Sequence, residues 1–408
     1  MKSKFKISLK TAGLVSIGAL TLLAGQPQTP DKNAAEVDVL NMRAHSALKQ
    51  ARANDSAASL ADAADAVHQA LQLAPKDFDA RKLDVKVLLA RHQFREALER
   101  ARAINRGTPD DVEAWGLVSD AALGLGDYAE AERTAQWMLN LRSTNVGGLE
   151  HGARLRELFG DHDGAREFWE SAIRLTLADD EQRAWLATQA ASLSRRTGHA
   201  AQAEALLRQI LLAIPNYQPA IAELARARME QHQYTDAVAI LRERYRKVQR
   251  PDVQFELARA LQLAGQETEA QAAYKEFERS ARAAMDAPYN YNHELVAYYT
   301  DRAPNPTEAV RIARIEIARR QDVETLDACA WALYASGDLQ KARQQIEKAL
   351  AVGLREASFF YHAGAIASKT KDNAAAVRYF NDALSVSAGS EAADAARGGL
   401  KEVQPHAD

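Results

Sequence analysis

Apolar residues along nearly the whole chain lie three and four positions apart, a spacing that places them on one stripe of an α-helix. The helical stripes share a register that alanine marks, with gaps of 34, 34, 34, 38, 34, 33, 39, 33 and 34 residues between successive alanines. The ten alanines are Ala63, Ala97, Ala131, Ala165, Ala203, Ala237, Ala270, Ala309, Ala342 and Ala376. The register predicts an array of one repeated unit rather than a fold organised around a catalytic pocket.

Two further positions follow the same register. Nine of the ten residues that stand twelve positions before an alanine are Ala, Ser or Gly, the exception being Val85. All ten residues four positions after it are apolar or aromatic: Val67, Ala101, Ala135, Trp169, Leu207, Leu241, Tyr274, Ala313, Ile346 and Phe380. Because small residues let two helix backbones approach closely, each unit is predicted to be a helical hairpin.

Short polar turns separate the two predicted helices of each unit. They begin at Gly126, Gly160, Gly265 and Gly337, where a left-handed residue would end the first helix. Pro75, Pro109 and Pro215 stand twelve residues after their alanines, where the second helix should end. Pro219 and Pro251 fall in the first turn of the next helix, where a missing N–H costs nothing.

A 34-residue helix–turn–helix unit with this pattern resembles the tetratricopeptide repeat. The third unit (Trp115, Val118, Ser119, Gly126, Tyr128, Ala131, Ala135) and the ninth (Leu326, Ala330, Leu333, Gly337, Ala342, Ala349) carry the resemblance best. It implies an all-α fold, a right-handed α-solenoid of about ten repeats over residues 44–389. The expected repeats are 44–77, 78–111, 112–145, 146–183, 184–217, 218–250, 251–289, 290–322, 323–356 and 357–389.

The array is expected to form one elongated solenoid in which each unit contacts only its neighbours. Insertions at 178–183 and 279–289 are the predicted bends. Arg244 and Glu316 depart from the pattern, because a small residue is usual at their position. Residues 390–408 are predicted to form a C-terminal cap and tail, helical at 391–397 and frayed beyond Gly398.

The N-terminal residues 1–25 have the pattern of an export signal. Four lysines precede an apolar run from Ala12 to Gly25, which is shorter than the ~20 residues of a spanning helix. Gln26 stands where a lipidated cysteine would be needed, so lipidation is excluded for this sequence. We expect a cleaved signal followed by a linker over 26–43 and a periplasmic or cell-envelope location; the alternative is an uncleaved inner-membrane anchor.

Composition and motifs argue against several functional classes. Loss of residues 1–25 would move the net charge from −3 to −7, because four lysines and no acids are removed; such a chain is not expected to bind nucleic acid. The lone Cys329 excludes an internal disulfide and is expected to pack as a small hydrophobe. The ten histidines have no metal-ligand spacing, and no phosphate-binding loop or nucleophile elbow is present. The sequence therefore predicts no enzyme, metal or cofactor.

By the resemblance, the first helix of each unit lines an inner groove. The middle units present Arg154, Arg195, Arg226 and Arg259, whose planar guanidinium groups suit carboxylates. The alternative is that these arginines form inter-helix ion pairs with Glu150, Glu157, Glu223 and Glu256.

The late units place aromatic residues toward the same groove. They are Tyr291, Tyr298, Trp331, Tyr334 and Tyr361, with Glu294, Glu324 and Asp327 nearby. Tyr and Trp are typical interface anchors, and the acidic neighbours favour a basic or amide-rich peptide. The alternative is that the rings pack between helices. We predict a non-catalytic scaffold that binds a protein or peptide partner; the alternatives are an envelope polysaccharide-assembly factor that binds glycan and a membrane-anchored cytoplasmic adaptor.

Overall fold

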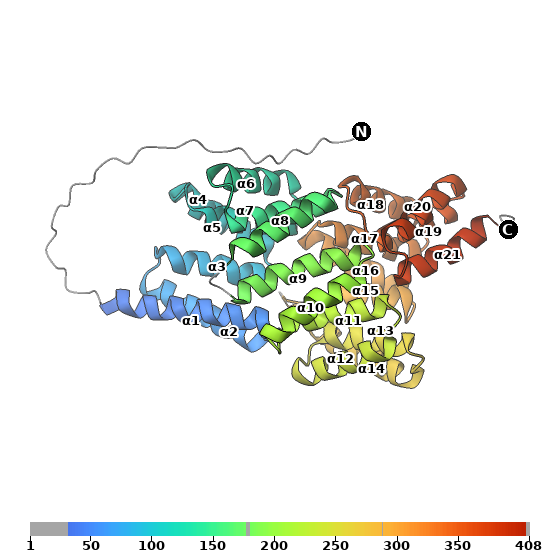
Figure 1. The fold of residues 1–408 in the computed structure, drawn as a ribbon, viewed down its shortest axis with the longest axis horizontal. Coiled ribbons are helices and arrows are strands. Elements are labelled where there is room, and N and C mark those ends of the chain that lie inside the picture. Colours follow the sequence, from blue (N-terminus) through green and yellow to red (C-terminus); the bar gives the residue numbers. More distant parts are fainter. Residues whose placement is uncertain (1–31, 177–179, 288, 405–408) are drawn as a thin grey trace.

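The computed structural model describes residues 32–176, 180–287 and 289–404, and the predicted signal segment 1–25 lies outside them. Within these ranges the chain forms twenty-one α-helices and no strand (Figure 1). The first eleven are α1 (Lys32–Asn54), α2 (Ala57–Leu73), α3 (Phe78–Ala90), α4 (Phe94–Gly107), α5 (Val112–Leu125), α6 (Tyr128–Leu141), α7 (Val146–Leu158), α8 (His162–Leu175), α9 (Asp180–Arg196), α10 (Ala200–Ala213) and α11 (Gln218–Glu230). The others are α12 (Tyr234–Lys247), α13 (Pro251–Leu263), α14 (Glu267–Ala283), α15 (Asn292–Asp301), α16 (Pro306–Arg319), α17 (Val323–Ala335), α18 (Leu339–Ala351), α19 (Ala357–Lys369), α20 (Asn373–Val386) and α21 (Glu391–Val403).

The hairpin turns follow the local chemistry that the sequence predicts. Gly126 and Gly160 take left-handed backbone conformations, each with φ of 76°. The next residue, Asp127 or Asp161, caps the following helix by accepting a hydrogen bond from a backbone N–H of its first turn. His92 adopts the same left-handed conformation, with φ of 56°, although it is not glycine. The hairpin therefore imposes the turn geometry, and glycine only reduces its cost.

The predicted register forms the core. Each of the ten register alanines has a relative exposure of 0 or 1%, and all ten residues four positions later are buried. A Cβ on Gly364, which occupies the small position of its unit, would lie within 2.5–3.1 Å of the Phe380 ring, so the two helices of that hairpin are in direct contact. Cys329 is buried in the same way, inside an apolar cluster. The all-α solenoid of helical hairpins is confirmed.

The expectation that each unit contacts only its neighbours is wrong. The N–H of Val323 at the start of α17 donates a 2.9 Å hydrogen bond to the Tyr128 hydroxyl at the start of α6. The turn at Gly126 lies against the backbone of Gln321, and that at Gly160 lies against Gly353. Early helices thus approach late ones, and in Figure 1 α8 and α18 are drawn next to each other. The solenoid coils tightly enough to contact itself after one superhelical turn.

One of the two departures from the repeat pattern forms a contact between hairpins that are distant in sequence. Arg244, buried at a position usually given to a small residue, forms a 2.6 Å ion pair with Asp55 in the first hairpin. Glu316, the second departure, is also buried and accepts a 2.8 Å hydrogen bond from the Asn292 side chain. Buried charges of this kind are tolerated when they are paired. Arg244 therefore joins units that are distant in sequence.

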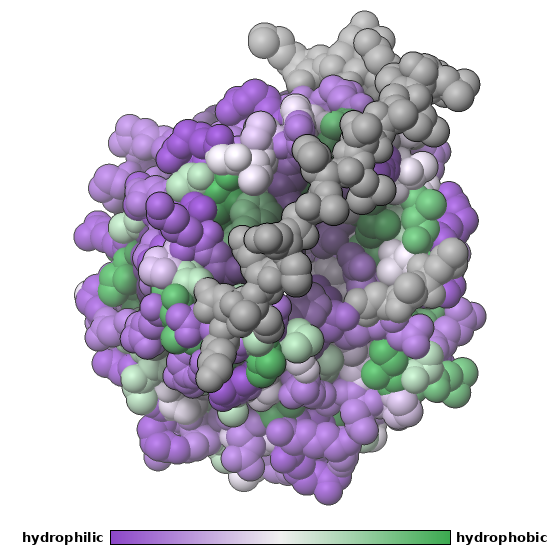
Figure 2. Space-filling view, turned by 90° about the vertical axis from the view of Figure 1, so that its left-hand side faces the viewer, coloured by the Kyte–Doolittle hydropathy of each residue, from purple (hydrophilic) through white to green (hydrophobic). Residues whose placement is uncertain are grey.

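Both ends of the array differ from the sequence prediction. Helix α1 begins at Lys32, so residues 32–43 belong to the first hairpin and not to a linker. Helix α21 continues through Gly398 to Val403 instead of fraying, because Gly399 lies against the Phe380 ring, where a side chain would not fit. None of the described helices combines the length and apolarity needed to cross a membrane. At the end of the molecule shown in Figure 2 the described surface is mainly hydrophilic.

Candidate functional site

The inside of the superhelix contains three adjoining cavities of about 490, 840 and 340 Å³. The first and second share Arg196, His293 and Glu324, and the second and third share Arg195, Arg226 and Glu391 among others. We call the three together the central chamber, and number its cavities one, two and three in that order. Its lining comes from the early, middle and late helices, so it exists only because the solenoid closes on itself.

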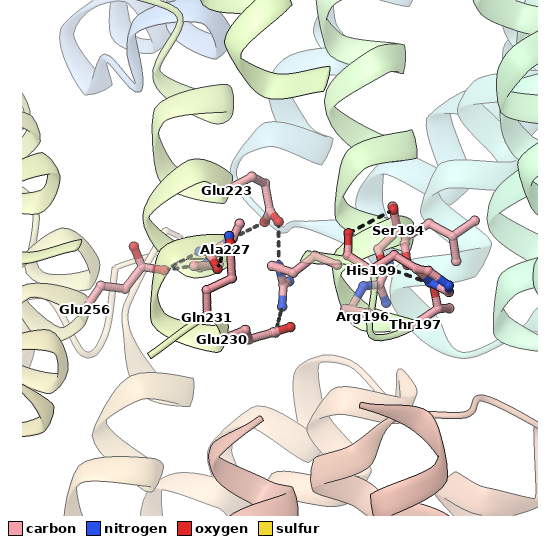
Figure 3. A network of polar contacts seen from close by, with 12 residues as sticks. Ser194, Arg196, Thr197, His199, Glu223, Ala227, Glu230, Gln231 and Glu256 are labelled. Atoms are coloured by element: carbon pink, nitrogen blue, oxygen red, sulfur yellow. Dashed lines mark hydrogen bonds and ion pairs between the residues drawn. The ribbon is translucent and has the colours of Figure 1, made fainter. Parts of the chain in front are cut away.

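A network of ion pairs joins the arginines of the middle units across three first helices (Figure 3). Arg195 on α9 binds Glu223 and Glu230 on α11, at 2.9 and 2.5 Å. Arg226 on α11 binds Glu223 at 2.5 Å and also pairs with Glu256 on α13. Burial opposes the ionisation of Glu223, but Arg195 and Arg226 outweigh it and lower the pKa of that carboxyl group. The two arginines thus keep Glu223 charged inside the chamber.

The remaining two predicted arginines are also paired. Arg154 on α7 binds Asp120 on α5 at 2.6 Å in the first cavity, and not the glutamates that the sequence suggested for it. Arg259 on α13 binds Glu391 on α21 at 2.6 Å, at the boundary of the second and third cavities. All four arginines line the chamber, and each has a carboxylate partner from this chain.

The first cavity has more acidic than basic groups. Seven carboxylates and four guanidinium groups line it. Glu294 on α15 and Glu324 on α17 form no ion pair with any of the described residues, whereas Asp252 and Glu157 in the same cavity are each paired. Burial, with a nearby carboxylate in each case, raises the pKa of both unpaired carboxyl groups to about 7. This part of the chamber can therefore accept positive charge.

The predicted aromatic residues divide between the chamber and the core. Tyr291 lines the first cavity, and Trp331 and Tyr361 line the second. Trp331 lies between two rings, with Tyr334 stacked at 4.6 Å on one side and His362 at 4.2 Å on the other. Its indole N–H donates a 2.7 Å hydrogen bond to Asp301. Both faces of the indole are thus covered by this chain.

Two of the predicted groove residues do not line the chamber. Tyr298 is buried, with 7% relative exposure, in the core between Tyr274 and Phe277. Its hydroxyl donates to Glu278, which is on the second helix of the preceding hairpin. Tyr334 packs against the same apolar cluster and against Trp331, away from the cavity linings. Tyr298 and Tyr334 therefore pack between helices, which was the alternative to a place in the groove.

The solved structures to which this chain is similar include tetratricopeptide-repeat proteins. A thermophilic TPR protein from Thermus thermophilus is 15% identical, covers 48% of this chain and 99% of its own, and has a TM-score of 0.41. A tetratricopeptide repeat protein from Parabacteroides merdae is 11% identical and covers 60% and 93%, with a TM-score of 0.42. The type IV pilus biogenesis factor PilW is 16% identical and covers 50% and 92%, with a TM-score of 0.43. No family model and no curated protein matches the sequence.

The chain has the tetratricopeptide-repeat fold. Its own hairpins, with their buried register, carry this identification. Within the tetratricopeptide-repeat solenoid, the first helices of successive hairpins line the inner side, as the resemblance implies.

Several lining residues of the tetratricopeptide-repeat chamber could not be found from the repeat register. Arg196 on α9 pairs with Glu157 on α7 and lies 3.7 Å from Glu356, which precedes α19. Tyr289 stacks beneath Arg250 in the first cavity and contacts the His92 ring from the second hairpin. The contacts of Arg196 with Glu356 and of His92 with Tyr289 join hairpins that are far apart in the sequence, so spacing along the sequence contains no signal for them.

Proposed function

We propose that this chain is an interaction scaffold that binds a basic segment of a protein partner in the central chamber. One observation carries the proposal: Glu294 and Glu324 line the first cavity and form no ion pair with the residues that the structure describes, while the neighbouring carboxylates are paired. A lysine or arginine side chain of the partner would supply the missing charge. Interactions between charged groups are strengthened inside such a chamber because surrounding protein lowers the local dielectric.

The aromatic residues favour a protein over a glycan as the occupant. Sugars bind aromatic side chains by lying on a ring face, and both faces of Trp331 are covered by Tyr334 and His362. The edge of that stack and the Tyr291 hydroxyl remain as contacts of the kind that peptides use.

The proposal is tested with a fluorescently labelled hexalysine peptide and the full chain, by fluorescence anisotropy at low and physiological salt. The double variant Glu294→Gln/Glu324→Gln is expected to weaken binding at least tenfold. Its charge-matched control, Glu276→Gln/Glu347→Gln, removes two half-exposed carboxylates from second helices α14 and α18 and should bind as the original chain does. Equal affinity of the two double variants would remove the first cavity from the proposal.

We further propose that the scaffold acts in the cell envelope after export. The support is the sequence pattern of residues 1–25, a lysine-rich start followed by a short apolar run. N-terminal sequencing of the protein purified from a cell fraction tests this: a start near Gln26 supports export, whereas an intact N-terminus in the membrane fraction supports the anchored adaptor.

A further inference from the structure

The C-terminal helix places one carboxylate between two arginines of the central chamber. Glu391 is the first residue of α21. One of its oxygens lies 2.6 Å from Nη2 of Arg259 on α13, and the other lies 2.8 Å from Nη2 of Arg302 at the end of α15. The two guanidinium groups come from consecutive hairpins and bind opposite oxygens of the same carboxylate. This is the arrangement by which paired arginines recognise a carboxylate ligand.

The position is open to solvent and adjoins free volume. Glu391 and Arg259 line both the second and the third cavity. The side chains of Glu391 and Arg259 are 37% and 36% exposed, so a ligand can reach the site from the chamber. Burial opposes ionisation of Glu391, but Arg259 and Arg302 outweigh it and lower the pKa of the carboxyl group. The occupant is therefore an anion.

Helix α21 is attached to the rest of the solenoid by apolar packing against the last hairpin. Ala393 and Ala396 are its only fully buried residues, and Gly399 lets it approach the Phe380 ring. Its packing partners are α19 and α20, which belong to the last hairpin. Across the chamber, the Glu391 side chain accepts hydrogen bonds from Arg259 on α13 and from Arg302 at the end of α15. If another carboxylate replaces that of Glu391, the apolar contacts between α21 and the last hairpin stay intact.

We propose that Arg259 and Arg302 form a carboxylate-binding site that Glu391 occupies in the free protein, and that an acidic side chain of a binding partner displaces it. The C-terminal helix then acts as a built-in competitor for the second cavity, which Arg259, Arg302 and Glu391 all line. The proposal does not depend on the basic segment proposed for the first cavity, because the two ligands have opposite charges and bind different groups. Glu294 and Glu324 would bind the basic segment, whereas Arg259 and Arg302 would bind the acidic side chain.

The test uses the full chain and a fluorescently labelled hexaglutamate peptide, with affinity measured by fluorescence anisotropy at low salt. Glu391→Gln removes the competitor but keeps the side-chain shape, and it should bind the peptide at least fivefold more tightly than the original chain. Addition of Arg259→Gln and Arg302→Gln to that variant should abolish the gain. Glu347→Gln, an equal change of charge on the outer helix α18, should leave the affinity unchanged.

Two outcomes would overturn the proposal. The first is a Glu391→Gln variant with unchanged affinity while circular dichroism and hydrogen exchange show α21 still folded. The second is a gain that survives in the triple variant, because the peptide would then bind elsewhere. The hexalysine experiment on Glu294 and Glu324 uses other variants and a peptide of opposite charge, so either proposal can fail alone.

Discussion

Closure of the solenoid can be tested at a single glycine. Gly126 has φ of 76°, and a Cβ at that position would lie 2.9 Å from the carbonyl carbon of Gln321 and nearer still to its oxygen. Gly265 occupies the equivalent turn of another hairpin with φ of 74°, and a Cβ there meets nothing within 4 Å. Gly126→Ala and Gly265→Ala therefore impose the same backbone strain, but only the first disturbs the contact between early and late repeats.

The expected magnitudes follow from that difference. An alanine in the left-handed conformation lowers the free energy of unfolding by roughly 1–2 kcal/mol. The same substitution reduces the entropy of the unfolded chain, which offsets about 0.4–1 kcal/mol of that loss. Gly265→Ala should thus lower the free energy of unfolding by about 1 kcal/mol. Gly126→Ala carries the same cost plus about 1–3 kcal/mol for the overlap with the Gln321 backbone. Part of that overlap can be relieved if the closed turn opens.

The assay combines urea unfolding, followed by circular dichroism, with small-angle X-ray scattering of the folded variants. We expect a lower urea midpoint for Gly126→Ala than for Gly265→Ala, together with a larger radius of gyration. Gly337→Ala serves as a second control, because its φ is 83° and its Cβ would also lie in open space. If all three variants have the same midpoint and the same radius of gyration, the early and late repeats do not touch in solution and the closure is refuted.

Three further changes have distinct expected results. Gly399→Ala should undock α21 and increase its hydrogen exchange, because the new Cβ would lie 2.7 Å from Cε2 of Phe380; Gly398→Ala, with nothing within 4 Å, should leave exchange unchanged or slow it. Glu294→Gln should stabilise the protein by about 3 kcal/mol at pH 8. The folded pKa of about 7 lies above the ordinary value of 4.5, so ionisation of Glu294 penalises the folded state at high pH. The gain measured by urea unfolding should vanish as the pH falls to about 4.5. Tyr128→Phe should lower the free energy of unfolding by about 1 kcal/mol, through loss of the hydrogen bond from the α17 backbone, and an unchanged urea midpoint would contradict that contact.

The repeat register was sufficient to predict the local structure, because it consists of residues that are close together in the chain. Ala131 and Ala135 lie on one helix face and Ser119 faces them across a hairpin, so their spacing specifies the pair of helices. The turn at Gly126–Asp127 is likewise a property of adjacent residues. Such short-range signals predict an α-solenoid without knowledge of how the helices pack beyond the next unit. Its inner side was implied only by the resemblance to the tetratricopeptide repeat.

What the register could not predict is how far the solenoid turns per repeat. Small packing angles add over successive hairpins, and only their sum decides whether Tyr128 meets the start of α17. That sum converts an open groove into a closed chamber. It also decides the partners of the predicted arginines: Arg195 and Arg226 pair with neighbouring first helices, within reach of spacing arguments, whereas Arg259 pairs with Glu391, 132 residues away.

The sequence by itself therefore determined the helices, the turns and the buried alanine register of this protein, since each depends on contacts within one hairpin or with the next. The tertiary structure alone decided that Glu294 and Glu324 share a cavity in which neither forms an ion pair with a described residue, and that Tyr298 belongs to the core. The physical reason is the same in both cases. A side chain's surroundings in a solenoid depend on the accumulated twist of many hairpins, and no short pattern of residues encodes that twist.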